Sequence, residues 1–293
     1  MSFDRVLITG GGGALASDLA ERLSGRCELA TPSQSELDIM NNTAVENFFA
    51  SHEPELVLNC AAEHNMGVCE AEPERTFVIN GTAVLRLAKL SSARGARFVT
   101  ISSNYVFDGD RSEPYGEDDR PNPRSVYGIS KLAGEYGAFA YAPDSLVVRT
   151  AGLFGLHGSE TKGGNFVHRI LAGARAKGEL NVVADQLLNP TYTGDLADAI
   201  LGAVEAEISG PLHLTNSGSC SWHEFAVAIV GLAGLDVPVH ETKSDPDTGG
   251  GGRPLNGVLA RPRADAAGVP VLRPWQDALA DYMQRAGLAA SSV

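Results

Sequence analysis

The stretch Arg5-Val-Leu-Ile-Thr-Gly-Gly-Gly-Gly-Ala-Leu-Ala16 decides the fold of this chain. A short β-branched run is followed by four glycines and then by the helical pattern Leu15–Leu23. Strand, glycine-rich turn and helix in this order are typical of a turn that binds dinucleotide phosphates. In the spacing G-x-x-G-x-x-A, Gly10 permits a sharp turn, Gly13 lets the backbone approach a pyrophosphate, and Ala16 allows close packing. A glycine cluster alone would equally suit a structural turn, so its position after the first strand is what favours phosphate binding.

The remainder of the first half alternates short apolar runs with helical periodicity. This alternation predicts an α/β fold, a Rossmann-type doubly wound parallel sheet covered by helices on both faces. A loop rich in Gly, Pro and Asp is expected at residues 104–123. Strands are expected at Arg5–Thr9, Cys27–Ala30, Leu56–Ala62, Arg97–Ser102 and Ser145–Thr150, and helices at Leu15–Leu23, Thr43–His52, Pro73–Ser91 and Ser125–Ala140.

The second half has a less regular pattern. We expect residues 1–150 to form the dinucleotide-binding domain, rejoined by parts of 181–215, and residues 151–293 to form mainly a smaller C-terminal substrate-binding lobe. The glycine-rich stretch Ser244–Arg253 suits a plain surface loop better than a mobile loop over a site. Helices are expected at Asn165–Lys177, Asp195–Ala206, Ser221–Leu235 and Trp275–Ala286.

The charge balance disfavours two classes of partner. Thirty-six acidic and 23 basic residues give a net charge of −13, which repels nucleic acid and anionic membranes over most of the surface. The longest apolar run, Phe225–Leu235, is shorter than the roughly 20 residues of a membrane span. Met1–Arg5 lacks the basic-then-apolar pattern of a secretion signal, so a cytoplasmic location is expected. The four cysteines lack metal-site spacing, and His64 with Cys69 would not complete a tetrahedral shell, so no metal is expected.

A tyrosine and a lysine four residues apart are the candidates for acid–base chemistry. Tyr127-Gly-Ile-Ser-Lys131 lies on a predicted helix, which places the phenol and the ammonium on one face. A nearby cation is expected to lower the tyrosine pKa and make Tyr127 a usable proton donor. Ser103 follows the strand Arg97–Ser102, at the edge where open α/β sheets bind ligands, and could orient a substrate carbonyl. Separately, each residue also suits a bland role, as a helix-surface pair or a turn cap.

The predicted second strand leaves the choice of cofactor open. It ends at Ala30-Thr-Pro-Ser33 without the acidic residue that usually binds the 2′-hydroxyl of NAD, and no Arg or Lys follows immediately to clamp a 2′-phosphate. NADP(H) or NAD(H) are therefore both expected cofactors. Asp38 could accept a hydrogen bond from the adenine amine, or could simply stabilise a turn.

Taken together, the glycine turn, Ser103 and Tyr127–Lys131 resemble the extended short-chain dehydrogenase/reductase family. Within it, the chain is similar to the dTDP-4-dehydrorhamnose reductase branch. The similar pieces occur in the family's order along nearly the whole chain, which is more specific than the glycine turn. They are Asn59-Cys-Ala-Ala62, Cys69-Glu-Ala-Glu-Pro-Glu74, Ser102-Ser-Asn-Tyr-Val-Phe-Asp-Gly109, Pro121-Asn-Pro123, Asn165-Phe166, Asp185-Gln186, Pro190-Thr191 and Arg253-Pro-Leu-Asn256.

The resemblance implies roles for individual residues. Ser103, Tyr127 and Lys131 would be catalytic, and Lys131 would also hold the nicotinamide ribose. Arg253, through its forked donors, is a candidate for the substrate diphosphate, although a solvated loop arginine is equally compatible with the sequence. Cofactor contacts are expected from Gly10, Gly13, Ala14, Leu15, Asp38, Ile39, Ala61, Ala62, Asn80, Tyr127 and Lys131, and substrate contacts from Asn104, Val106, Phe107, Asn165, Phe166, Gln186 and Arg253.

The sequence departs from that family at three places. Ser103 stands where many relatives carry Thr, which keeps the hydroxyl, and Asn104 replaces a common Asp. Ala151 and Gly152 stand where rhamnose-forming relatives often have Ser-Trp, so a sugar-stacking aromatic is missing. We therefore expect a roomier pocket, and with it a different deoxyhexose or a different product stereochemistry.

The expected activity is the NAD(P)H-dependent reduction of the 4-keto group of a nucleotide-linked deoxysugar, with dTDP as the expected nucleotide. Two alternatives stay open: a sugar-nucleotide epimerase that keeps NAD bound, and a catalytically silent NADP-binding regulatory subunit, which the retained Tyr127 and Lys131 disfavour. A 4,6-dehydratase is disfavoured, since Asn104 and Tyr105 stand where dehydratases of the family usually carry an Asp-Glu pair. The sequence is compatible with a homodimer but does not specify one.

Overall fold

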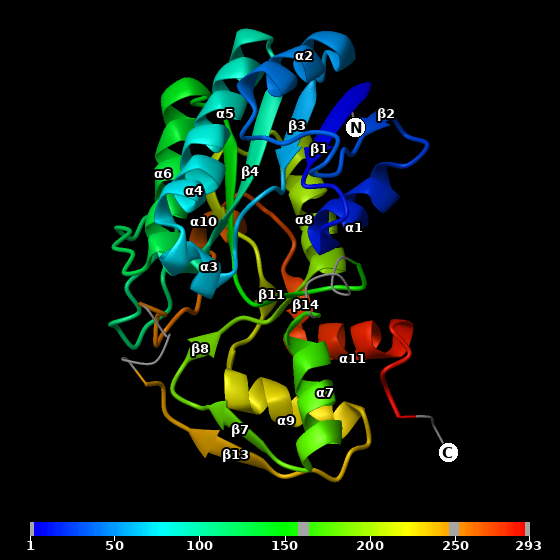
Figure 1. Ribbon diagram of the computed structural model, residues 1–293, viewed down its shortest axis with the longest axis vertical. Helices are drawn as coiled ribbons and strands as arrows, with labels where there is room; N and C mark the ends of the chain where they lie inside the picture. The colour runs from blue at the N-terminus through cyan, green and yellow to red at the C-terminus, as the bar shows by residue number, and fades with distance from the viewer. Residues whose placement is uncertain (1–2, 158–163, 246–251, 291–293) are drawn as a thin grey trace.

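The computed structural model describes residues 3–157, 164–245 and 252–290. Its centre is a six-stranded sheet in the order β10-β5-β4-β3-β1-β2, and every neighbouring pair is parallel (Figure 1). The predicted α/β class and doubly wound sheet are confirmed. The strands are β1 Arg5–Thr9, β2 Glu28–Ala30, β3 Leu56–Asn59, β4 Arg97–Ser103, β5 Leu146–Thr150 and β10 Gly210–His213.

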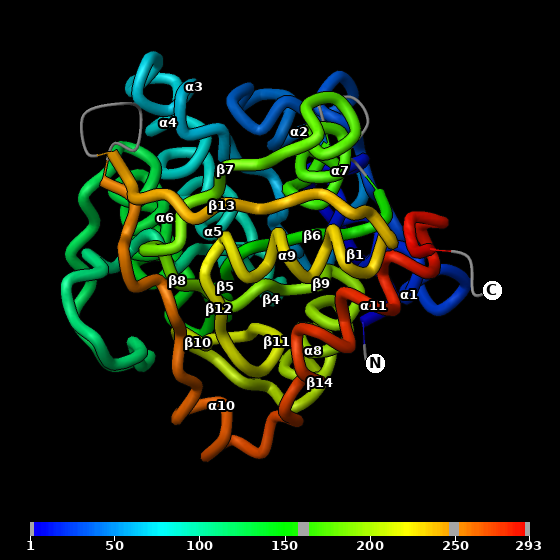
Figure 2. The backbone as a smooth tube through the Cα atoms, turned by 90° about the horizontal axis from the view of Figure 1, so that it is seen from below, coloured from blue at the N-terminus to red at the C-terminus, as the bar shows by residue number. Residues whose placement is uncertain are grey.

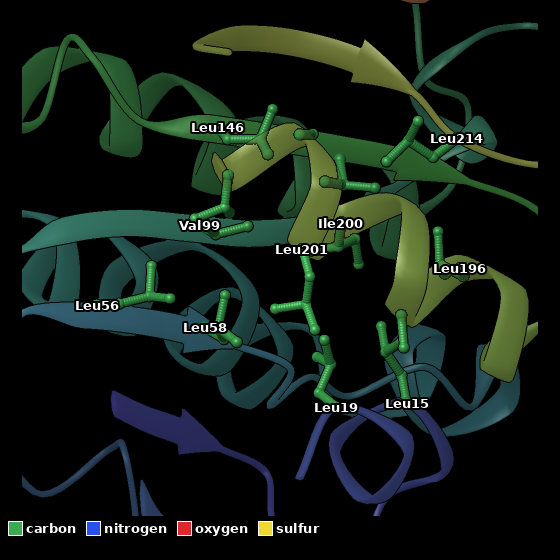
Figure 3. Packing of buried hydrophobic residues seen from close by; sticks show 14 of the residues in the cluster. Leu15, Leu19, Leu56, Leu58, Val99, Leu146, Leu196, Ile200, Leu201 and Leu214 are labelled. Atoms are coloured by element: carbon green, nitrogen blue, oxygen red, sulfur yellow. The ribbon is translucent and has the colours of Figure 1, made fainter. Parts of the chain in front are cut away.

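Alternating residues of the strands bury opposite faces of the sheet. On β1, Val6 and Ile8 join one apolar cluster and Leu7 joins another, as the period of two requires. The first cluster packs beneath helices α1 (Ala14–Leu23) and α8 (Thr193–Glu205), and Figure 3 shows its leucines closing the space between these helices and the sheet. Helices that contribute to the second cluster are α2 Asn42–His52, α5 Ala83–Ala93 and α6 Val126–Tyr141.

The predicted helix Pro73–Ser91 is interrupted in the structure. It consists of α4 (Pro73–Phe77), a π-helical turn at Val78–Thr82, and α5. The wider turn contains Asn80, whose side chain is 1% exposed. Such turns occur frequently at functional sites, and this one lies next to the candidate site described below. The short helix α3 (Met66–Ala71), capped by the Asn65 side chain, was not expected.

The smaller lobe is built around aromatic side chains. Helices α7 (Phe166–Lys177), α9 (Trp222–Leu232) and α11 (Trp275–Arg285) enclose Phe154, Phe225 and Tyr282 together with their neighbours. The parallel pair β7 (Leu180–Val183) and β13 (Val239–Thr242) covers α9, as Figure 2 shows from below. The helices lie close to the predicted ranges, and the N-caps Asn165 and Ser221 mark two of the starts.

Several short elements had no signal in the sequence. Two- and three-residue strands have no measurable period, and this explains why they were missed. Part of the second half packs against the large sheet: helix α8 and the short helix α10 (Pro262–Ala266) contribute to its first apolar cluster, and strand β10 pairs with β5. The short pairs are β6 (Leu153–Phe154) with β9 (Thr191–Tyr192), β8 (Leu187–Leu188) with β12 (Cys220–Ser221), and β11 (Asn216–Ser217) with β14 (Leu272–Pro274).

No helix in the described ranges combines the length and the apolar character that crossing a bilayer would require.

Candidate active site

The glycine turn lies where the winding of the sheet changes direction. Strand β1 has β2 on one side and β3 on the other, and ligands of open α/β sheets bind at such a switch point. Gly10 has φ +76°, and a Cβ there would lie 2.8 Å from the Ala61 nitrogen. A Cβ on Gly11 would lie 2.4 Å from the Thr31 carbonyl oxygen. Side chains are therefore excluded, and the backbone is left free to approach a ligand.

Helix α1 begins at this turn with its first N–H groups unpaired by any side chain. Its N-cap, Gly13, makes no side-chain cap hydrogen bond, so the first turn offers donors and a positive dipole end to an anion. Ala14 is half-buried, whereas the Leu15 side chain lies in the core, so Leu15 can offer only its backbone. The residues present fit a dinucleotide pyrophosphate.

Three further residues expected to contact the cofactor lie near the glycine turn or on the helix after β3. Ala61 and Ala62 follow β3 and are half-buried. The Asn80 amide is used within the protein: its Oδ1 accepts from the Glu63 nitrogen at 2.9 Å, and its Nδ2 donates to the Glu63 oxygen at 2.8 Å and to Ser130 Oγ at 3.0 Å. Asn80 thus fixes the loop after β3 against α6.

Asp38 and Ile39 lie in a turn that follows β2. Asp38 Oδ1 accepts from the Met40 nitrogen at 2.9 Å, which is the turn-stabilising role considered for it. The Ile39 side chain is packed in the core beneath α2. The contact of these two residues with a cofactor stays a prediction.

The structure brings Ser103 and Tyr127 together. Ser103 ends β4, Tyr127 lies in the first turn of α6, and their side chains form a hydrogen bond. The Tyr105 ring meets the Tyr127 ring edge-on at a centroid distance of 5.4 Å. Lys131, one helical turn further along α6, is 5% exposed.

The tyrosine pKa differs from the expectation. Burial raises the pKa of Tyr127 to about 12, and the Ser103 hydrogen bond opposes this only in part. Burial also lowers the pKa of Lys131 to about 8, with Glu135 acting in the other direction. The expected lowering of the Tyr127 pKa by a nearby ammonium is therefore wrong for this structure, because loss of water dominates and the group that opposes it is the Ser103 hydroxyl rather than the Lys131 ammonium. Tyr127 is consequently a phenol that keeps its proton at neutral pH.

A buried polar layer lies under this edge of the sheet. Thr9 Oγ1 donates to Asn59 Oδ1 at 2.6 Å, and Asn59 Nδ2 donates to Thr100 Oγ1 at 3.0 Å. The three residues are register partners on β1, β3 and β4. Their hydrogen bonds link the strand ends from which the glycine turn and Ser103 emerge.

A buried ion pair extends this layer to α6. Glu135 accepts from Ser102 Oγ at 2.5 Å and from Arg149 Nε and Nη2 at 2.9 and 2.7 Å. Glu135 is 2% exposed and Arg149 is 4% exposed. Since Glu135 follows Lys131 by one turn and Ser102 precedes Ser103, the contacts of Glu135 join the strand that carries Ser103 to the helix that carries Tyr127 and Lys131. Glu135 was not predicted as a site residue, although it follows Lys131 by one helical turn in the sequence.

Asn104, Val106 and Phe107 are all buried. Asn104 Nδ2 donates to the Gly257 carbonyl at 2.9 Å, and Ser103 Oγ donates to Asn104 Oδ1 at 3.2 Å. The side chains of Val106 and Phe107 are 0% and 1% exposed, and Phe107 stacks on Tyr115 at 4.4 Å. The side chains of Val106 and Phe107 are thus packed in an apolar cluster, and their contact with substrate stays a prediction.

Three expected substrate residues also hold the smaller lobe together. Asn165 caps α7 and donates to the Gly155 carbonyl at 3.2 Å and to Tyr282 Oη at 3.0 Å. Phe166 packs against Trp222 at 4.5 Å. Gln186, 7% exposed, donates to Ser244 Oγ at 2.8 Å.

Arg253, in contrast, lies on the side of Tyr105 and Tyr127. Its side chain is hydrogen-bonded to the Tyr105 hydroxyl, and Tyr105 contacts Tyr127. Arg253 itself is exposed, so it remains accessible to an anion. The central part of the predicted loop Ser244–Arg253, residues 246–251, lies outside the described residues.

The space beside Gly152 is already filled. A Cβ at Gly152 would lie 2.6 Å from Leu188 Cδ1, and the backbone there has φ +55°. The buried Leu188 side chain therefore takes up the space at the Cβ position, and a roomier substrate pocket stays a prediction.

One acidic group in the described ranges has ligand atoms close enough for a metal ion: Asp18, Glu21 and His157. The buried carboxylate of Asp18 already accepts from Thr193 Oγ1 at 2.5 Å and lies 3.8 Å from an Arg22 nitrogen. These contacts account for Asp18 without an ion.

Comparisons with known proteins agree with this geometry. The family model described as the RmlD substrate binding domain matches residues 4–287. The dTDP-4-dehydrorhamnose reductase of Mycolicibacterium smegmatis is 39% identical over 282 residues, which cover 94% of this chain and 84% of that protein. The dTDP-4-keto-6-deoxy-D-glucose reductase of Streptomyces niveus is 35% identical over 279 residues, covering 94% and 95%. The crystal structure of dTDP-4-dehydrorhamnose reductase from Bacillus anthracis in complex with NADP is similar with a TM-score of 0.90 and 31% identity, covering 96% and 99%.

Proposed function

The chain belongs to the family of the RmlD substrate binding domain, and on that premise we propose that it reduces the 4-keto group of a dTDP-linked 4-keto-6-deoxyhexose with NADPH or NADH. The observation that carries the proposal is the Ser103–Tyr127 hydrogen bond, formed at the same edge of the sheet as the glycine turn. A proton donor and a dinucleotide-binding turn are what a carbonyl reduction requires.

A reduced nicotinamide dinucleotide, which the glycine turn at Gly10 and Gly13 would hold, would supply the hydride for the carbonyl carbon. Ser103 orients the carbonyl oxygen, and Tyr127 donates its phenolic proton to that oxygen, so the ketone gains one hydride and one proton and becomes an alcohol. The pKa of Tyr127, about 12, keeps this proton in place until the oxygen becomes basic. Lys131 is protonated below its pKa of about 8 and offsets the negative charge that develops.

The nature of the substrate is supported by what the relatives act on. Both relatives are named as reductases of a dTDP sugar with a keto group at position 4. We propose the same nucleotide and position here. Arg253 is the candidate for the diphosphate, because it is exposed and contacts Tyr105, which in turn contacts Tyr127. Asn165, Phe166 and Gln186 act from beneath the sugar site, by holding the lobe in shape.

Cofactor oxidation with dTDP-4-keto-6-deoxyhexoses, in parallel with NADH and NADPH, tests the proposal. We expect one cofactor to be oxidised for each sugar reduced. A retained NAD with no net consumption would indicate the epimerase instead, and cofactor binding without turnover would indicate the regulatory subunit.

The location, the assembly and the domain boundaries belong to the same proposal. An acidic protein that depends on NAD(P)H fits the cytoplasm, and a homodimer fits the family. Cell fractionation and light scattering test these two. Residues 1–150 with parts of 181–215 are proposed as the cofactor domain, supported by the pairing of β10 with β5.

A further inference from the structure

The segment that follows β2 borders the glycine turn directly. The Gly11 nitrogen donates to the Pro32 carbonyl at 3.0 Å, and a Cβ on Gly11 would lie 2.4 Å from the Thr31 oxygen. In dinucleotide-binding sheets, the end of the second strand faces the adenosine ribose, where a carboxylate binds a 2′-hydroxyl or a cation binds a 2′-phosphate. Residues just beyond Pro32 are therefore placed to read that position.

A carboxylate is folded back to this place. The Ser33 nitrogen and Ser33 Oγ both donate to Glu36 Oε2 at 2.8 Å, and the Glu36 nitrogen donates to the Ser33 carbonyl at 3.1 Å. Ser35 Oγ lies 3.0 Å from Ser33 Oγ, and the next residue, Leu37, is anchored in the core. The bonds from Ser33 hold the pKa of Glu36 below its usual value, so the carboxylate is ionised at neutral pH. The sequence alone showed no acidic residue at the end of the strand, because the turn that returns Glu36 was not predicted.

The surroundings supply no matching cation from this part of the chain. Between Arg26 and Arg75 the sequence contains no Lys or Arg. Two arginines on neighbouring elements are already paired: Arg5 with Glu55 at 2.8 Å, and Arg22 with Asp198 at 2.5 Å. The segment between Arg26 and Arg75 therefore offers no Lys or Arg that could bind a 2′-phosphate.

We propose that the Ser33–Glu36 turn receives the adenosine ribose and makes this chain prefer NADH to NADPH, with Glu36 accepting the 2′-hydroxyl and repelling a 2′-phosphate. The inference rests on the proposed function only in that the chain binds a nicotinamide dinucleotide. It specifies which one, which the family resemblance leaves open.

The test is the dissociation constant of each reduced cofactor, measured on the full chain by nucleotide fluorescence without any sugar. We expect NADH to bind about tenfold or more tightly than NADPH, with the ratio shrinking at high salt because exposed charges are screened. Glu36→Gln should bring the ratio to within about threefold, and Glu36→Arg should reverse it. Glu46→Gln, which removes an exposed carboxylate from α2, is the matched control and should leave the ratio unchanged.

Equal or tighter binding of NADPH by the unaltered chain would overturn the inference, and so would a ratio unmoved by Glu36→Gln. These results would leave the reductase proposal standing. If neither dinucleotide binds, both proposals fall. If NADH binds preferentially but no 4-keto sugar is reduced, only the proposed function fails.

Discussion

The two walls of the proposed cleft use their polar side chains differently. On the sheet wall, Ser103, Tyr127 and Lys131 lie on a strand end and a helix, and a separate buried layer holds those elements in place. On the lobe wall, Asn165 and Gln186 themselves make the bonds that hold the lobe. On the sheet wall, the residues proposed for the chemistry differ from those that support them, whereas on the lobe wall the residues expected near the substrate are themselves the support. Substitutions should therefore separate activity from stability on the sheet wall and change both together on the lobe wall.

The largest expected effect is on the sheet wall, at the proton donor. Tyr127→Phe should lower kcat by roughly 10²–10⁴-fold, the usual contribution of general acid catalysis, and leave the dissociation constant for the cofactor within twofold. Steady-state turnover and nucleotide fluorescence measure the two quantities. Tyr136→Phe, on an exposed face of the same helix, is the control and should be silent. Full turnover in Tyr127→Phe would remove this residue from the chemistry.

The Glu135–Arg149 ion pair, which supports the sheet wall, should affect stability rather than the chemical step. Glu135→Gln leaves the buried Arg149 without its counter-charge, and we expect a loss of about 3–5 kcal/mol in the free energy of unfolding. Urea denaturation measures it. The double variant Glu135→Gln/Arg149→Met removes both charges and should recover part of that loss. A single variant as stable as the parent would mean that the ion pair does not hold the site together.

The glycine turn offers a test confined to cofactor binding. Gly10→Ala places a Cβ 2.8 Å from the Ala61 nitrogen at a positive φ, so we expect at least about tenfold weaker cofactor binding, since backbone strain of this kind costs about 1–3 kcal/mol. Calorimetric titration with NADH measures it. Gly202→Ala in α8, where a Cβ would meet nothing within 4 Å, is the matched control. Unchanged binding in Gly10→Ala would contradict the assignment of the turn.

On the lobe wall, Asn165→Ala should reduce stability and activity together. Loss of an N-cap costs about 0.5–2 kcal/mol, and the Gly155 and Tyr282 hydrogen bonds are lost with it. We expect a Tm lowered by a few degrees and kcat/KM lowered by less than about tenfold. A large rise in KM at unchanged Tm would instead make Asn165 a direct substrate ligand.

The remaining expected effect is a pH dependence of stability. Burial holds the pKa of Lys131 at about 8 in the folded protein, against an ordinary value of 10.5. Between pH 8 and pH 10.5 the unfolded chain binds more protons at this residue than the folded protein does. Lys131 therefore makes the free energy of unfolding increase as the pH rises from about 8 to 10.5. Urea denaturation of Lys131→Met beside the unaltered chain isolates the slope. Equal slopes would mean that Lys131 is solvated.

The same contrast explains what the sequence could predict. Strand β1, the glycine turn and the Tyr127–Lys131 pair were predicted residue by residue, because a fixed local geometry demands them. The roles of Asn165, Gln186 and Val106 could not be predicted, because they depend on partners distant in sequence, such as Tyr282 and Ser244. The tyrosine pKa was mispredicted for a related reason: spacing does not reveal that Tyr127 is buried, and burial raises its pKa. The close approach of Leu188 to Gly152 could not be predicted either, because the two residues are distant in sequence.

The central claim, that this chain carries out a net reduction at C4, is tested most directly with nicotinamide cofactor that carries deuterium in the transferred position. Mass spectrometry of the product should show one deuterium, bound to C4 of the sugar, for each cofactor oxidised. Product that lacks the label, or labelled cofactor recovered unoxidised after the sugar has changed, would contradict it.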